Sequence, residues 1–400
     1  MGSAVLGLVV IALAVVVAAI GGYLTALGAA ALLRRPRIPE PGARRRRFAV
    51  LIPAHNEASV IDRVIRSVRE QTYPARGLDI FVVADNCTDA TATIAREAGA
   101  IVHERVDAVD RAKGHALRWL LPHVREHGRH DAYIVVDADS ILSSEFVAQM
   151  DARLQAGSRV IQAHYRVLNA TASPTSALRE AALASLHYLR PRGRAALGLS
   201  CGLKGNGMCF DAAVLDKHGW SSVGLAEDVE LHLALVRAGI RVDFAPEATV
   251  SADMPTNLGD AASQNLRWEA GRLGAVRQQI PSMLAGGLAR GDAVVLDAAI
   301  EQLIPPLSVA FVGGAIVSVA ALVVGSATAS ALAVFGTVAI AGHVVAGLIA
   351  TRAPTRTYLA LAHAPRYVVW KVVLYARAVI APAGAPWIRT RRSFGEGPRD

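Results

Sequence analysis

Two long uncharged segments constrain the fold of this 400-residue chain more than any other feature of its sequence. No charged residue occurs from Ala4 to Leu33, and none occurs at residues 302–351. As a helix the first segment is about 45 Å long, which exceeds the roughly 30 Å hydrocarbon core of a bilayer. The second is long enough for two crossings, with a turn expected at residues 325–328. The sequence therefore predicts one N-terminal and two C-terminal transmembrane helices.

The positive charge of the chain lies beside these apolar segments. Of the net charge of +9, residues 34–47 supply +6, from seven arginines and one glutamate, and residues 389–400 supply +2. The nearly neutral middle excludes a basic groove, so we expect no nucleic-acid partner. Cytoplasmic loops of membrane proteins are rich in arginine and lysine, which predicts a multi-pass protein of the cell membrane with residues 34 onward in the cytoplasm. A cleaved signal peptide is less favoured, because its charges would precede the apolar run.

The remaining segments are expected to lie on the membrane surface or in the cytoplasm. Residues 367–385 are apolar but carry Lys371 and Arg377, and a crossing there would place the basic tail outside. We therefore expect this stretch to be interfacial or re-entrant. The predicted organisation is a transmembrane helix at 1–33, a basic segment at 34–47, a catalytic domain at 48–255, interfacial amphipathic helices at 256–300, two transmembrane helices at 301–350, and an interfacial or re-entrant segment with a basic tail at 351–400.

Alternating strands and helices are predicted from residue 48 onward. The expected strands are 48–53, 79–84, 100–103 and 132–136, and the expected helices are 57–71, 90–98 and 112–127. This alternation indicates a doubly wound α/β sheet, in which ligands bind at the carboxyl ends of parallel strands. Polar residues follow three of these strands, as His55-Asn56-Glu57, Asp85-Asn86 and Asp137-Ala138-Asp139. The sequence therefore predicts a ligand site at this edge of the sheet.

Three groups of residues have side chains suited to ligand binding or catalysis. Asp137 and Asp139 can hold a hard cation together with phosphate oxygens and water, although such pairs also occur in ordinary turns. Glu227 and Asp228 begin a predicted helix, so each suits a helix cap or a general base. Residues 264–268 combine a guanidinium that suits a diphosphate with an indole that suits a sugar ring. An interfacial helix would also contain arginine and tryptophan.

The order of these motifs resembles that of the membrane-integrated family 2 glycosyltransferases, a group that includes cellulose, hyaluronan and poly-N-acetylglucosamine synthases and ceramide glucosyltransferase. The matching segments are IPAHNE at 52–57, VVADNCTD at 82–89, KGHAL at 113–117, DAD at 137–139, KGNGM at 204–208, AED at 226–228 and QNLRW at 264–268. Each segment alone is weak evidence, but the ordered series over residues 48–270 is specific. The resemblance implies a GT-A fold (Rossmann-like, with a mostly parallel sheet), a donor that is usually a UDP-sugar, and Mg²⁺ or Mn²⁺ as cofactor.

The resemblance also implies roles for individual residues. The residues that would bind the donor are Pro53, His55, Glu57, Asp85, Lys113, Asp137 and Arg267. Asp139 and Asp137 would hold the metal ion, and Asp228, with Glu227 beside it, would be the catalytic base. The residues on the acceptor side would be Gln264, Trp268, Gly205 and Asn206. Two positions depart from the family pattern: Asn86 stands where a second carboxylate is common, so it receives no metal role, and Ala226 stands where threonine is common.

The expected function is inverting transfer of a hexosyl or N-acetylhexosaminyl group at the cytoplasmic membrane face. The partners would be a UDP-sugar donor, a lipid or glycan acceptor and membrane lipids. The small number of predicted membrane helices favours a lipid-linked acceptor over processive polysaccharide synthesis, although an oligomer could supply a channel. A non-catalytic membrane protein that binds a nucleotide sugar or glycan is less favoured, because the metal-binding and base carboxylates are both present.

Overall fold

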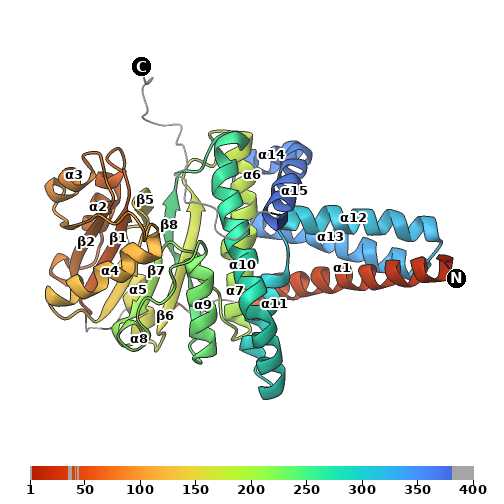
Figure 1. Ribbon diagram of the computed structural model, residues 1–400, viewed down its shortest axis with the longest axis horizontal. Helices are drawn as coiled ribbons and strands as arrows, with labels where there is room; N and C mark the ends of the chain where they lie inside the picture. Colours follow the sequence, from red (N-terminus) through yellow and green to blue (C-terminus); the bar gives the residue numbers. More distant parts are fainter. Residues whose placement is uncertain (1, 35–37, 41, 43–44, 381–400) are drawn as a thin grey trace.

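The structure, a computed structural model, describes residues 2–34, 38–40, 42 and 45–380. The predicted basic tail and the end of the third apolar stretch lie outside these residues. Figure 1 shows three parts: a sheet with its covering helices, a bundle of long apolar helices, and helices that stand between them.

The α/β region is built on a mixed sheet with strand order β3-β2-β1-β4-β7-β6-β8-β5. The strands are β1 (Phe48–Ala54), β2 (Leu78–Asp85), β3 (Ile101–Arg105), β4 (Ala132–Val135), β5 (Ser140–Leu142), β6 (Val160–Val167), β7 (Met208–Asp211) and β8 (Val242–Ala252). The pairings among β1 to β4 are parallel, which confirms the predicted doubly wound arrangement. The second half is mixed, because β7 runs antiparallel to both β4 and β6, and β5 runs antiparallel to β8.

Helices cover both faces of this sheet. Side chains of β1 alternate between two hydrophobic clusters, with Val50 and Ile52 on one face and Ala49 and Leu51 on the other. A central parallel strand buried on both faces has this continuous apolar sequence. The helices on the first face are α2 (Ile61–Arg69), α3 (Thr91–Glu97) and α5 (Phe146–Gln155). Those on the second face are α4 (Lys113–Glu126), α8 (Ala212–His218) and α9 (Glu227–Arg237).

Three helices of the described chain are long and apolar enough to cross a membrane, as the sequence predicted. They are α1 (Gly2–Leu33), α12 (Leu307–Val324) and α13 (Ala327–Ala350), which lie side by side and project together from the rest of the molecule (Figure 1). A β-carbon on Gly336 of α13 would lie 2.4 Å from the carbonyl oxygen of Val17 in α1. Small residues of this kind allow close packing of helices in membranes. The predicted turn is confirmed at Gly325, whose φ of +74° ends α12.

Two groups of helices connect the sheet to this bundle. The first is a nearly continuous helix of α6 (Pro174–Leu183), a π-helical turn η2 (Ala184–Leu189) and α7 (Arg190–Ala196). The second follows the sheet as α10 (Leu258–Arg290) and α11 (Ala293–Leu303). Figure 1 shows α10 running crosswise to the apolar helices at their base. The short α14 (Thr355–Ala360) contacts α6, and α15 (Ala364–Ile380) contacts α10 and α12.

Part of the basic N-terminal segment binds the α/β region. Arg46 pairs with the fully buried carboxylate of Asp151 at 3.1 Å, and Arg47 pairs with Asp79 at 2.8 Å. The Arg46 pair, with one partner buried, lies in a lower dielectric than an exposed pair would. These arginines therefore attach the segment to the sheet in addition to contributing positive charge.

Candidate active site

A cavity of about 1150 Å³ extends from the carboxyl ends of β1, β2 and β4 to the apolar helices. Pockets for one small ligand are typically roughly 300–1,000 Å³, so this one has room for two substrates. Most of the predicted site residues line it: Pro53, His55, Glu57, Asp85, Lys113, Asp137, Asp139, Gly205, Glu227, Asp228, Gln264, Arg267 and Trp268. Segments separated by up to 215 positions, from Pro53 to Trp268, are thus brought to one place.

The first part of the cavity is formed where β1 and β2 end. Asn56 and Asn86 adopt left-handed backbone conformations, with φ of +55° and +51°, which asparagine tolerates better than most residues. Nδ1 of His55 lies 2.7 Å from the carbonyl oxygen of Asp85, which joins the two strand ends. The Asp85 carboxylate pairs at 2.6 Å with Arg105, a buried residue that sequence reasoning missed. Asp85 and Arg105 are also register partners in β2 and β3, a relationship that only the strand pairing reveals.

The second part follows β4 and contains the predicted metal-binding carboxylates. Lys113, at the start of α4, forms an ion pair with Asp137 and donates to the carbonyl oxygen of Gly205. Burial alone would lower the pKa of Lys113, but the carboxylates of Asp137, Glu227 and Asp228 outweigh it and raise this pKa. Lys113 therefore stays charged and balances one of the two carboxylates after β4.

The donor set after β4 fits a hard divalent cation. Asp137 and Asp139 both line the cavity, and carboxylate oxygens are the ligands that Mg²⁺ and similar ions prefer. Within the described ranges no cluster of three or more His, Cys, Asp or Glu side chains suits a metal ion. A cation at this position would therefore complete its coordination with oxygens of a bound diphosphate and with water.

Asn206, which was expected on the acceptor side, does not line the cavity. Its side chain is fully buried. Its Oδ1 accepts from the backbone N–H of Asp137 at 3.1 Å, and its Nδ2 donates to Oγ of Ser140 at 2.8 Å. Both ends of the Asn206 amide are used in these hydrogen bonds. Asn206 thus supports, from the buried side, the turn that carries Asp137 and Asp139.

The predicted base lies at the first turn of α9. Asp228 accepts from the backbone N–H of Val229 at 2.9 Å, as a helix cap would. A β-carbon on Gly205, which has a φ of +77°, would lie 3.5 Å from a carboxylate oxygen of Asp228, so this loop approaches the carboxylate closely. Burial raises the pKa of Asp228, and the ammonium groups of Lys113 and Lys204 offset only part of this rise. A carboxylate with a raised pKa is a stronger proton acceptor.

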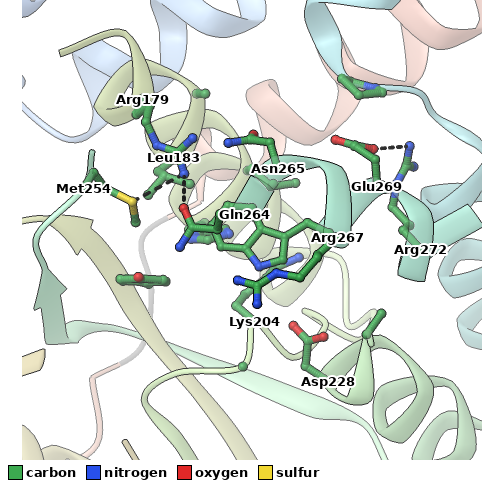
Figure 2. A pocket seen from close by; sticks show the side chains of 18 of the residues that line it. Arg179, Leu183, Lys204, Asp228, Met254, Gln264, Asn265, Arg267, Glu269 and Arg272 are labelled. Carbon is green, nitrogen blue, oxygen red and sulfur yellow. Dashed lines mark hydrogen bonds and ion pairs between the residues drawn. The ribbon is translucent and has the colours of Figure 1, made fainter. Parts of the chain in front are cut away.

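Residues 264–268 lie on α10 and form the roof above Asp228 (Figure 2). Oε1 of Gln264 accepts from the guanidinium of Arg179 at 3.2 Å, and the same guanidinium lies 5.4 Å from the ring centre of Trp268. Trp268 keeps 41% of its surface exposed, enough to contact a substrate. Figure 2 shows the side chains of Arg267 and Lys204 next to Asp228. Arg179, on α6, was missed because nothing near it in sequence indicates a role.

A buried ionic network supports the floor of the cavity. Arg194 of α7 pairs with Asp297 at 2.9 Å and with Glu301 at 2.5 Å, both on α11. Glu301 also lies 3.6 Å from Lys204, and the hydroxyl of Tyr23 in α1 donates to Asp297 at 2.7 Å. The network therefore connects the first apolar helix to the loop that carries Lys204.

Comparison with known proteins identifies relatives of this region. The family described as "Glycosyltransferase like family 2" matches residues 45–271. The probable glycosyltransferase YdaM of Bacillus subtilis is 25% identical over 236 residues, 56% of this chain and 55% of that protein. Protein RfbJ of Shigella flexneri is 32% identical over 103 residues, 26% of this chain and 72% of that protein. The chain thus spans little more than half the length of YdaM.

One solved structure is similar over most of the chain. The mannosyltransferase PcManGT from Pyrobaculum calidifontis, in complex with GDP-mannose and Mn²⁺, has a TM-score of 0.52 and 19% identity. The similarity covers 83% of this chain and 98% of that one. Together with the family match, this likeness confirms the GT-A fold expected from the sequence.

Proposed function

Because this chain belongs to the glycosyltransferase-like family 2, we propose that it is a membrane enzyme that transfers a sugar from a nucleotide diphosphate sugar, with inversion, to a hydroxyl group. One observation carries the proposal: Asp228, the pair Asp137 and Asp139, and Arg267 line the same cavity. A base, a pair of metal-binding carboxylates and a guanidinium are the groups that this reaction requires.

The donor occupies the part of the cavity formed by β1, β2 and β4. Pro53, His55, Glu57 and Asp85 surround the nucleotide, and Arg267 faces the diphosphate from the roof. Burial lowers the pKa of Arg267 and the Glu227 carboxylate raises it, with a net lowering. Arginine nevertheless remains protonated at neutral pH, so it can compensate charge that develops on the departing diphosphate.

The acceptor hydroxyl lies beside Asp228. Its proton passes to the carboxylate of Asp228, and its oxygen bonds to the anomeric carbon as the bond to the diphosphate oxygen breaks. A single displacement of this kind inverts the anomeric centre. Gly205 leaves space beside the carboxylate, and Trp268 offers an exposed ring face to a sugar or acceptor.

Asp139 and Asp137 are the residues that would hold Mg²⁺ or Mn²⁺. When bound, the cation supplies Lewis-acid stabilisation of the diphosphate. Asn206 keeps the turn that carries both carboxylates in place from behind. Lys113 has to share Asp137 with the cation, and its contact with Gly205 gives it a second partner.

The experiment that tests this function uses the full chain in detergent with a panel of UDP- and GDP-sugars and Mn²⁺. We expect release of the nucleoside diphosphate, and we expect Asp228→Asn to lower its rate by about 10²- to 10⁴-fold, the usual contribution of a general base. Asp216→Asn removes an exposed carboxylate on α8 and serves as the matched control. Wild-type turnover in a folded Asp228→Asn variant would overturn the assignment of the base.

We also propose that the catalytic region lies on the cytoplasmic side, as a positively charged segment after α1 favours. The test uses a chain without its native cysteines, into which Ser221→Cys or Ser3→Cys is introduced. A membrane-impermeant maleimide added to intact cells should label Ser3→Cys alone, and Ser221→Cys only after permeabilisation. The opposite pattern would reverse the proposed orientation.

A further inference from the structure

The cavity continues beyond Asp228 into an apolar arm. Its walls there include Phe311 of α12, Ile340, Val344 and Val345 of α13, and Val368 of α15, and we call this part the membrane-side arm. Because α12 and α13 project away from the sheet, the arm leads from the catalytic residues toward the membrane (Figure 1). Hydrocarbon chains gain free energy when they leave water for such surroundings, whereas the hydroxyl groups of a glycan would lose hydrogen bonds there.

The π-helical turn η2 and the start of α7 also line the cavity, and η2 contacts α13, which forms part of the arm. Ser185, His187 and Arg190 all line the cavity at this place, and we call them the η2 cluster. Ser185 Oγ, His187 Nδ1 and Arg190 Nε are buried without a hydrogen-bond partner in the described part of the chain. π-Helical turns occur frequently at functional sites, and unpaired buried polar atoms are costly unless a ligand satisfies them.

Arg190 gives this cluster a positive charge. It is 4% exposed, and no ion pair to it exists among the described residues. The nearby carboxylates of Asp297 and Glu301 are already paired with Arg194 and Lys204. Burial lowers the pKa of Arg190 to about 10, so it is still protonated at neutral pH. Arg190 is thus left without a carboxylate partner among the described residues, and an anion in the cavity would compensate its charge.

From these two features we propose that the acceptor is an anionic lipid: its hydrocarbon chain occupies the membrane-side arm, its negative group binds the η2 cluster, and its hydroxyl faces Asp228. This inference rests on the proposed function and names its acceptor class. The bond changes are those given above: the lipid hydroxyl loses its proton to Asp228, its oxygen bonds to the anomeric carbon, and the nucleoside diphosphate leaves with the electron pair.

Binding is tested on the full chain in phosphatidylcholine nanodiscs, without donor. The nanodiscs contain either phosphatidylglycerol, which is anionic and carries hydroxyl groups, or diacylglycerol with the same chains, which is neutral. Lipid that stays bound after extraction is measured by native mass spectrometry. We expect wild-type protein to retain phosphatidylglycerol about tenfold better than diacylglycerol, a preference within the range of one charge-assisted hydrogen bond. Equal retention of the two lipids would overturn the inference.

Matched variants assign this preference to the η2 cluster. Arg190→Gln should abolish it, whereas Arg190→Lys, which keeps the charge, should retain most of it. The control is Arg192→Gln, two residues further along α7. The Arg192 side chain binds Tyr188 and does not line the cavity, so this variant should behave as wild type. Val344→Trp fills the arm and should lower retention of both lipids. Unchanged preference in a folded Arg190→Gln protein, or an equal loss in Arg192→Gln, contradicts the proposal.

Transfer is measured separately, with a radiolabelled sugar donor and the same nanodiscs. Label in the chloroform-soluble fraction supports a lipid acceptor, and label only in a water-soluble polymer overturns it in favour of a growing glycan. Release of nucleoside diphosphate without any acceptor reports on the proposed function alone. If nucleoside diphosphate is released but the two lipids are retained equally, the lipid inference is rejected and the transferase proposal stands. If no nucleoside diphosphate is released in any condition, the transferase proposal itself is rejected.

Discussion

The ammonium nitrogen of Lys371 lies 2.9 Å from a carboxylate oxygen of Glu269 and 2.9 Å from Oδ1 of Asn265. All three side chains are buried, and both partners belong to the part of α10 that forms the roof of the cavity. α15 is therefore attached to the roof through a buried charge. This contact explains why an apolar segment contains a lysine, because its charge is matched within the protein.

Loss of this contact should loosen the roof. In Lys371→Met the remaining cation beside Glu269 is Arg272, 3.2 Å away. We expect this variant to lose about 2 kcal/mol of stability, since breaking a buried pair leaves one charge poorly compensated. Thermal unfolding of the detergent-solubilised chain measures the effect. Arg366→Met, an exposed position of the same helix, is the control. The double variant Lys371→Met with Glu269→Gln should recover part of the loss, and no recovery would argue against a direct pair.

Arg267 is expected to act on the donor and not on the fold. Arg267→Ala should lower the turnover of donor by about 10- to 10³-fold, as removal of one group that stabilises transition-state charge does, with little change in the unfolding temperature. Arg290→Ala, an exposed arginine at the end of the same helix, should leave both unchanged. A large fall in the unfolding temperature of Arg267→Ala would instead show that Arg267 serves mainly to hold α10 in place.

The parts of this structure that follow from local sequence were predictable, and those that depend on distant segments were not. The strands that end at Ala54 and Asp85 are marked by apolar runs and by the polar residues that follow them. The pairing of Arg105 with Asp85 and the approach of Arg179 to Trp268 arise only when separate elements meet. The burial of the Asn206 side chain was not foreseen, because a motif gives the position of a residue but not the direction of its side chain.

The observed helix boundaries differ from the predicted ones for a related reason. Residues 58–60 continue the apolar pattern of the predicted helix at 57–71, yet they form a turn, and α2 begins at Ile61. The backbone N–H of Glu57 and that of Ala58 bind the side chains of Thr91 and Asp89, contacts from the next strand–helix unit. Periodicity alone does not report such contacts.

Removal of metal should abolish transfer, and Asp139 should set the affinity for the cation. We expect chelation to stop nucleoside diphosphate release, and we expect Asp139→Asn to raise the Mn²⁺ concentration for half-maximal rate more than about tenfold, because a charged oxygen ligand is lost. Asp253→Asn, a carboxylate of the same cavity that pairs with Arg63, is the control. An unchanged Mn²⁺ requirement in Asp139→Asn would move the metal site elsewhere.

Lys204 should set the pH range of the reaction through Asp228. Asp228 must be deprotonated to accept a proton, so the rate falls as the pH decreases through its pKa. The ammonium group of Lys204 lowers this pKa, against the rise caused by burial. Lys204→Met should therefore move the acidic limb of kcat/KM to higher pH, by about 0.5–1 unit, and Lys204→Arg should leave it in place. If the acidic limb does not move in Lys204→Met, the pKa that it reports belongs to a group other than Asp228.

The contact between α7 and α1 should be intolerant of even one methyl group. A β-carbon on Gly193 would lie 2.2 Å from the carbonyl oxygen of Leu27, and backbone atoms cannot move aside cheaply. Gly193→Ala should thus destabilise the chain by about 1–3 kcal/mol, as overpacking does, although alanine is otherwise the better helix former. Gly313→Ala in α12, where no atom lies within 4 Å of the new carbon, is the control and should be neutral or stabilising in thermal unfolding. Because Arg190 and Arg194 also belong to α7, Gly193→Ala should slow transfer as well. Equal stability of Gly193→Ala and Gly313→Ala would show that α7 and α1 do not pack this closely.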